Sequence, residues 1–195
     1  MKFTTRDLAT IAVFGALWGI VEISLGTLLK SMNVPLSGAV LATIGLAVAL
    51  TGRVFVPKRG ATLFTGVIAL LLKLFSLGGI IIGPIIGILA EALIAEIVLA
   101  LASKPNLVAF LVSGSLGVLW TLLQPLITGP LLFGRGLLDV WKDVITKGSK
   151  LLELNPNAIL VVVLVLVVIH LVLGGIGGWL GWNIGKQLNN RLGRA

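Results

Sequence analysis

The sequence predicts an all-α integral membrane protein, a single domain over residues 1–195 with six transmembrane helices. Two observations support this fold class. Of the 195 residues, 57% are hydrophobic and only 11% are charged, whereas soluble domains carry roughly 25% charged residues. The apolar residues also gather into six runs of about 20 residues, the length that crosses the hydrocarbon core of a bilayer. Little of the chain remains outside these runs, so we do not expect a second sizeable domain.

The six predicted helices are separated by short segments that contain proline, glycine or charged residues. They cover residues 8–29, 36–56, 61–77, 80–102, 107–128 and 158–186. The third is short and should end in a turn at Gly78 and Gly79. The last is longer than a typical span, so we expect it to tilt, to kink at Gly174 and Gly175, or to extend into water.

The positions of the basic residues predict the orientation. With the N-terminus inside, the cytoplasmic segments hold nine Lys and Arg residues and the outer loops hold five. Because Lys and Arg favour cytoplasmic loops, both termini should lie in the cytoplasm of a multi-pass protein of the cell (cytoplasmic) membrane. The net charge of +8 therefore fits membrane topology and anionic lipids of the bilayer, and no nucleic acid partner is expected.

Residues 134–156 form the long loop between the fifth and sixth predicted helices. Apolar residues alternate with charges there at near-helical spacing, which predicts an amphipathic helix on the outer membrane surface. A lid over an outward-facing pocket is the alternative. The apolar positions are Leu137, Leu138, Trp141, Val144 and Ile145.

Five polar residues fall within the predicted spans, each on a different helix: Glu22, Lys73, Glu91, Gln124 and His170. All lie at the middle of the membrane or nearer its outer side. Because such groups must face protein or water rather than lipid, they predict one substrate-binding cavity open to the outside.

Three of these residues also have a structural alternative. Lys73 could neutralise Glu22 or Glu91 as a buried pair. His170 could be a packing residue on an otherwise apolar helix, and Gln124 could repair a helix kink at Pro125.

Glu96 has a different interpretation from Glu91. It lies near the inner end of its span and roughly 140° around the helix from Glu91. We expect it to be structural and to meet Lys58, Arg59, Lys104 or a cytoplasmic partner. Glu22, Glu91 and Glu96 are three acids within the membrane, and Lys73 is the one base set against them. The excess of two acids favours a cation or a hydrogen-bond donor as ligand.

Two tryptophans precede polar residues by one helical turn. Trp18 shares the face of Glu22, and Trp120 shares the face of Gln124. Rings in these positions could stack on a flat heterocycle, so both are candidate substrate-binding residues. Core packing is the commoner role for a single Trp.

Small residues predict close helix contacts on the first and last helices. Ala12 and Ala16 are four residues apart on a face roughly 100° from Glu22, and could meet a partner protein. Gly177, Gly181 and Gly185 form a longer ladder, for which we expect packing within the domain.

Motifs for chemistry are absent from the sequence. There is no cysteine, no HExxH motif and no glycine-rich phosphate loop, so we expect no metal site and no cofactor in this chain. Ser113 or Ser115 with His170 could form an intramembrane serine hydrolase, but SGSLG does not match the GxSG motif of rhomboid proteases. A membrane scaffold subunit whose glutamates only pair between helices is the stronger alternative.

The chain resembles the substrate-binding S-components of energy-coupling factor (ECF) vitamin importers, an ABC transporter class. Six spans in fewer than 200 residues, two cytoplasmic termini, AxxxA on the first helix and a polar outer cavity carry the resemblance. RVFVPKRGATLFTGVIALLLK (53–73) and GPIIGILAEALIAE (83–96) are similar to the branch associated with thiamine and hydroxymethylpyrimidine.

The resemblance implies a function without catalysis, so we do not expect an enzyme. The protein would bind a small vitamin-class solute outside and topple in the membrane, driven by a membrane T-component and two cytoplasmic ATPase subunits that use ATP. Ala12 and Ala16 would dock on the T-component, and Glu91 would belong to the substrate side. The third helix carries Gly66 and Lys73 where that branch tends to have acids, which leaves a neutral pyrimidine or an anionic vitamin open.

Overall fold

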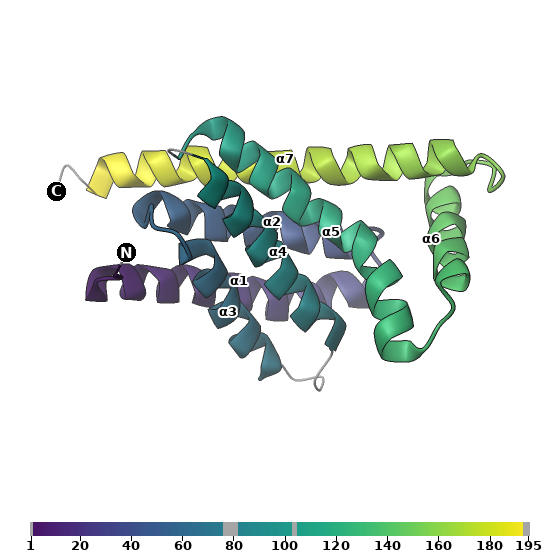
Figure 1. Ribbon diagram of the computed structural model, residues 1–195, viewed down its shortest axis with the longest axis horizontal. Helices are drawn as coiled ribbons and strands as arrows, with labels where there is room; N and C mark the ends of the chain where they lie inside the picture. The colour runs from purple at the N-terminus through teal and green to yellow at the C-terminus, as the bar shows by residue number, and fades with distance from the viewer. Residues whose placement is uncertain (1, 76–81, 103–104, 193–195) are drawn as a thin grey trace.

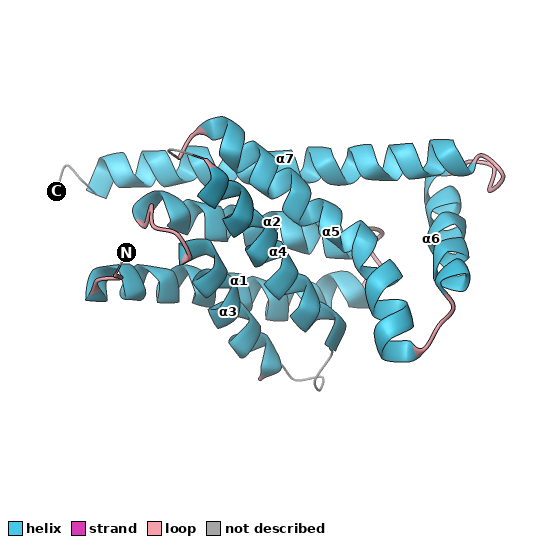
Figure 2. Ribbon diagram, viewed as in Figure 1, coloured by secondary structure: helices cyan, strands magenta, loops and turns pink. Residues whose placement is uncertain are grey.

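The computed structural model describes residues 2–75, 82–102 and 105–192. Within these residues every regular element is an α-helix, and no strand is present (Figure 2). In chain order the helices are α1 (Thr5–Ser31), α2 (Ser37–Phe55), α3 (Ala61–Leu74), α4 (Ile82–Leu101), α5 (Leu107–Phe133), α6 (Leu137–Leu152) and α7 (Ile159–Leu192) (Figure 1).

Each predicted span overlaps one of these helices, and α1, α5 and α7 extend past their predicted ends. Within the described residues, five helices are long and apolar enough to cross a membrane. The exception is α3, an apolar helix of 14 residues. At 1.5 Å per residue it is about 21 Å long, less than the roughly 30 Å of bilayer hydrocarbon. The predicted helix ends at 77 and 80, and the turn at Gly78 and Gly79, lie outside the described residues.

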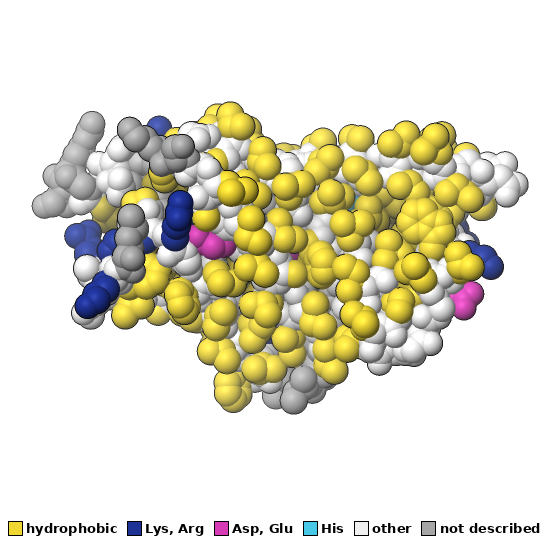
Figure 3. All heavy atoms as spheres, viewed as in Figure 1, with side chains coloured by type: hydrophobic (Ala, Val, Ile, Leu, Met, Phe, Trp, Pro, Cys, Tyr) yellow, Lys and Arg dark blue, Asp and Glu magenta, His cyan; other side chains and the backbone are white. Residues whose placement is uncertain are grey.

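The surface is apolar around the middle of the molecule. In Figure 3 hydrophobic side chains cover the central region, while Lys and Arg gather mainly toward the end where Figure 1 places both termini. Large apolar side chains such as Val13, Ile20 and Val168 are exposed on α1 and α7. A surface of this kind is suited to lipid rather than to water.

The predicted glycine ladder on α7 packs inside the domain, as expected. Gly177, Gly181 and Gly185 are buried against α2. A Cβ atom on Gly181 would lie 2.6 Å from the Cβ atom of Leu50, which is too close for any side chain to fit without movement. The ladder therefore holds the backbones of α2 and α7 close together.

A second glycine stripe on α7, not predicted from the sequence, contacts α5. A Cβ atom on Gly178 would clash with the carbonyl oxygen of Phe110, and a Cβ atom on Gly174 would clash with the carbonyl oxygen of Gly114. Helix α7 runs unbroken through this contact for 34 residues, so the kink considered at Gly174 and Gly175 is not present. With glycines on two sides, α7 packs closely against two neighbours at once.

The amphipathic helix predicted in the long loop is α6, which crosses one end of the molecule (Figure 1). It packs on α5 where Val140 meets Gly129, and on α7 where Gly148 meets Leu166. Leu137 and Leu138, which share the predicted apolar face, remain exposed. Helix α6 is thus fixed to the domain along one side and leaves apolar side chains free at its start.

Glu96 joins three helices at the other end of the bundle. Its Oε1 accepts a hydrogen bond from the backbone N–H of Gly60 at 2.7 Å, and its Oε2 accepts one from Thr62 at 3.0 Å. Gly60 caps α3 with a φ of +91° and has no side chain, so a carboxylate from α4 satisfies the N-terminus of α3. The guanidinium of Arg53 on α2 lies 3.5 Å away and is 4% exposed.

The structural role predicted for Glu96 agrees with these contacts, but its partners differ. Lys58 pairs with Asp7, and Arg59 donates to a backbone carbonyl at the end of α4. Lys104 lies outside the described residues. The cation that reaches Glu96 comes instead from the last turn of α2, within a span rather than from a loop.

Replacing Glu96 by glutamine should destabilise the protein strongly. The Glu96→Gln variant removes the charge that pairs with buried Arg53, and breaking a buried ion pair costs about 3–5 kcal/mol. Thermal unfolding in detergent measures the effect. Glu153→Gln makes the same substitution at an exposed position, so it is the control and should leave the unfolding midpoint unchanged. Equal midpoints for the two variants would contradict this role.

Candidate functional site

A cavity of about 310 Å³ opens between α1, α2, α3, α4 and α5. Four of the predicted substrate-binding residues line it: Glu22, Lys73, Glu91 and Gln124. Each comes from a different helix, as the sequence analysis expects. The lining also includes residues not singled out from the sequence: Lys30, Ser37, Gly38, Thr121 and Thr128.

Lys73 pairs with Glu22 rather than with Glu91. Its Nζ donates a hydrogen bond of 2.6 Å to the backbone carbonyl oxygen of Glu22 and lies 3.9 Å from the Oε2 of the same residue. Both side chains are largely buried. The ion pair fixes α1 to α3 at the cavity wall, and it neutralises one of the two carboxylates there.

Glu91 is a buried polar residue of the cavity that is only partly satisfied. It is 5% exposed, and its Oε2 atom has no hydrogen-bond partner among the described residues. A buried carboxylate oxygen without a partner costs several kcal/mol if the group is charged. This atom is therefore the place where a hydrogen-bond donor on a bound molecule would gain most.

Gln124 connects α5 to the start of α4. Its Nε2 donates a hydrogen bond of 2.6 Å to the carbonyl oxygen of Gly83, so it does not repair its own helix at Pro125. A Cβ atom on Gly87 would lie 3.0 Å from the Gln124 Oε1. Gly87 thus leaves room for the amide between the two helices.

The charge balance of the cavity differs from the sequence estimate. Glu96, counted as an unpaired acid, is paired with Arg53, and Lys30 joins Lys73 in the lining. Two acids and two bases therefore line the cavity, and the predicted excess of two acids is wrong. A cationic ligand is no longer favoured on charge alone.

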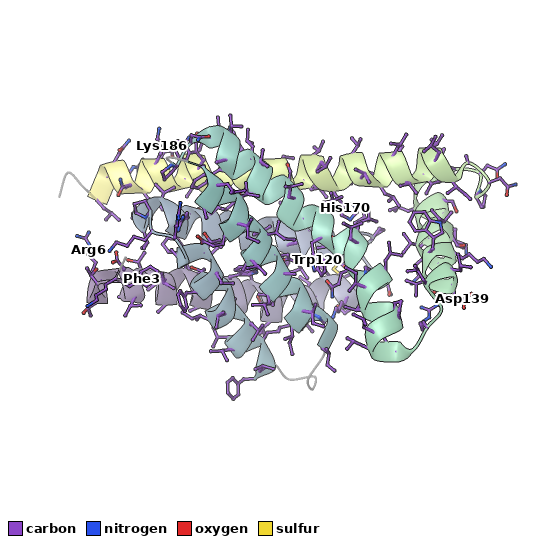
Figure 4. All side chains as sticks on the ribbon, viewed as in Figure 1. Phe3, Arg6, Trp120, Asp139, His170 and Lys186 are labelled. Carbon is purple, nitrogen blue, oxygen red and sulfur yellow. The ribbon has the colours of Figure 1, made fainter. Side chains whose placement is uncertain are left out.

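Three predicted site residues lie elsewhere. Trp18 is fully buried in the core, where its indole packs against the backbone of Gly45 on α2. Trp120 is half-buried, and its indole Nε1 has no hydrogen-bond partner among the described residues. His170 lines a neighbouring cavity of about 590 Å³ instead. Figure 4 labels Trp120 and His170. The structure thus places neither indole in the lining beside Glu91.

The missed residues of α5 had a signal in the sequence. Thr121, Gln124 and Thr128 are three and four residues apart, which puts them on one helical face. All three line the cavity. Threonines are common on spans, however, because their hydroxyls donate to a carbonyl of their own helix. Thr128 does so here, to the carbonyl of Gln124.

The serine–histidine arrangement considered from the sequence is not formed among the described residues. The hydroxyl of Ser113 donates to the carbonyl of Ala109, and that of Ser115 donates to the carbonyl of Leu171. The Nδ1 of His170 is hydrogen-bonded to the carbonyl of its own helix. Over residues 2–75, 82–102 and 105–192 no cluster of ligands suited to a metal ion is found either.

A family model described as "Hypothetical bacterial integral membrane protein (Trep_Strep)" matches residues 5–188 of the chain. The match covers all seven helices except the last residues of α7. No curated protein and no solved structure matches the chain.

The cavity should be open to water-soluble reagents, whereas the neighbouring core should not. The chain has no cysteine, so Ser37→Cys, on the cavity wall, and Ser113→Cys, at 0% exposure, each introduce a single thiol. In detergent, a water-soluble maleimide should label Ser37→Cys at least about tenfold faster, because Ser113 is reached only by local unfolding. Similar rates for both variants would show that the cavity is closed.

Proposed function

The chain belongs to this family of bacterial integral membrane proteins, and we propose that it is the substrate-binding subunit of an ATP-driven importer of the ECF type. In this proposal the cavity beside Glu91 captures a small vitamin-class solute from outside the cell. Thiamine or a related pyrimidine precursor is favoured by the sequence resemblance. The subunit binds the solute and performs no chemistry on it.

The Oε2 atom of Glu91, which has no hydrogen-bond partner among the described residues, is the observation that supports solute binding most. Its neighbours in the lining have partners: Glu22 has Lys73, and Gln124 has a backbone carbonyl of α4. A chain that needed Glu91 only for packing would leave it with an avoidable cost. An amino or hydroxyl group of a heterocycle would complete its hydrogen bonding.

We further propose that all six apolar segments cross the cell membrane, with both termini in the cytoplasm. Arg6 and Lys186 lie at one end of the molecule and Asp139 lies at the other (Figure 4). The excess of basic residues near Arg6 and Lys186 favours the cytoplasm for that end. The exposed lining residues Lys30 and Gly38, and helix α6, would then face outward.

The partners in this proposal are a membrane T-component and two cytoplasmic ATPase subunits. Ala12 is exposed and Ala16 is half-exposed, so the small-residue face of α1 is free in this chain. Gly15 and Gly19, by contrast, pack against α3. The AxxxA face is therefore available for a T-component to approach closely.

A membrane scaffold is the second candidate function. The buried pairs Arg53–Glu96 and Lys73–Glu22 favour it, because both are satisfied within the chain. A scaffold makes no use of an open polar cavity, so measurement of solute binding separates the two functions. An intramembrane serine hydrolase stays a weaker alternative, which a serine-reactive probe would test.

Replacing Glu91 by glutamine should weaken solute binding strongly without unfolding the protein. Glutamine keeps the size of the side chain but loses the charge and half of the acceptor capacity at the cavity wall. Quenching of tryptophan fluorescence by thiamine and by hydroxymethylpyrimidine measures the affinity. We expect a loss of about 10–100-fold, because a hydrogen bond to a charged group is worth about 1.5–3 kcal/mol. Glu153→Gln should bind like the wild type; equal affinity of Glu91→Gln would remove Glu91 from the site.

Blocking the small-residue face of α1 should prevent assembly but not solute binding. The variant Ala12→Trp/Ala16→Trp places two large rings where a partner helix would lie. Val168→Trp/Val172→Trp is the control, since both residues are exposed four apart on α7. Co-purification with a T-component and ATPase subunits gives the readout. If the α1 variant assembles as well as the α7 variant, docking at Ala12 and Ala16 is wrong.

A further inference from the structure

A second cavity of about 590 Å³ adjoins the first and lies between α2, α5, α6 and α7. The two cavities share three lining residues, Gly38, Thr121 and Pro125. Most of its walls are apolar, with Leu36 and Leu166 among them. A ligand in this space would therefore lie against apolar side chains and could extend toward Glu91.

His170 places one hydrogen-bond acceptor on this apolar wall. It is 3% exposed, and its Nδ1 lies 2.7 Å from the carbonyl oxygen of Leu166. Because a carbonyl only accepts, Nδ1 must carry a proton, which in the neutral ring leaves Nε2 as an acceptor. Nε2 has no hydrogen-bond partner among the described residues. This acceptor is therefore available to a ligand in the cavity.

Lys147 and Lys150 of α6 line the same cavity, and no acidic residue does. Neither lysine has a carboxylate within ion-pair distance in the described part of the chain. Asp143 on α6 is engaged by Arg135 at 2.6 Å, and that hydrogen bond lowers the pKa of the Asp143 carboxyl, to which the charge of Lys147 adds. The cavity thus combines apolar walls with two exposed lysines that form no ion pair in the described part of the chain.

Gly38, an exposed residue in the first turn of α2, lines both cavities. A Cβ atom built on Gly38 meets no atom within 4 Å, so the space beside it is open. Most other glycines of the bundle, such as Gly114 and Gly178, are packed against neighbouring backbone. Gly38 therefore makes no helix contact, and a side chain placed there would enter the space beside both cavities.

We propose that the second cavity binds a phosphate or carboxylate group carried on an apolar or aromatic body. Lys147 and Lys150 hold the anion as point charges, the body lies along the apolar walls, and His170 accepts a hydrogen bond from it. The anion could belong to the imported solute, a choice that rests on the proposed function, or to a phospholipid headgroup. The same lysines serve in both cases.

Neutralising the two lysines tests the anion site. The Lys147→Gln/Lys150→Gln variant is compared with Lys2→Gln/Lys142→Gln, which removes the same charge from exposed positions that do not line the cavity. Each full-length protein is mixed in detergent with one of three probes, and native mass spectrometry measures how much of the protein carries it. The probes are hydroxymethylpyrimidine, its monophosphate, and phosphatidylglycerol. We expect the affinity for one phosphorylated probe to fall at least about tenfold in Lys147→Gln/Lys150→Gln and to stay unchanged in the control. A tenfold loss corresponds to about 1.4 kcal/mol of binding free energy.

The three probes separate the possible outcomes. Loss confined to the monophosphate assigns the site to the solute, and loss confined to phosphatidylglycerol assigns it to lipid. If neither phosphorylated probe binds, or if both bind equally to the two variants, the anion site is wrong. Binding of unphosphorylated hydroxymethylpyrimidine reports on the first cavity. The proposed function can therefore stand when the anion site is wrong, and the anion site can stand when the proposed function is wrong.

Filling the open space beside Gly38 tests whether one ligand spans both cavities. Gly38→Leu adds a side chain into open space and should not disturb the fold, because glycine is the poorer helix former. For a spanning solute, the monophosphate should lose at least about tenfold in affinity, while phosphatidylglycerol in the second cavity alone should be unaffected. Unchanged monophosphate binding would show that the solute does not extend past Gly38.

Discussion

The structure depends on one constraint: a polar group on a membrane helix must find a partner in the protein or face water, because lipid offers none. Glu96 meets it completely, with two backbone N–H groups and Arg53. Glu22 meets it through Lys73. Glu91 meets it only in part, and it lies where a cavity opens. The three buried glutamates thus range from structural cap to candidate ligand.

Glycines make the closest helix contacts of the bundle. Between α2, α5 and α7 the helices are held in close contact at Gly114, Gly178 and Gly181. Toward the α6 end, Gly38 has open space beside it and lines both cavities. Close glycine contacts and an open glycine thus let one small bundle pack tightly and still hold a ligand.

Hydropathy predicted the six apolar helices, because each apolar run had to pair its backbone within itself, and amphipathic spacing predicted α6. Depth along the spans was enough to gather Glu22, Lys73, Glu91 and Gln124. It could not find the partner of Glu96, since Arg53, at the inner end of its helix, counts among the cytoplasmic charges when only residue order is known. It also could not tell the rotation of a helix about its axis, which buries Trp18 in the core and turns His170 into the second cavity.

The central claim is that this chain captures a small solute beside Glu91. The most direct measurement is mass spectrometry of small molecules released when the detergent-purified wild-type protein is denatured. The account predicts an aromatic heterocycle at close to one molecule per chain. A preparation known to be folded that releases no small molecule at that level would contradict tight solute binding and favour the scaffold.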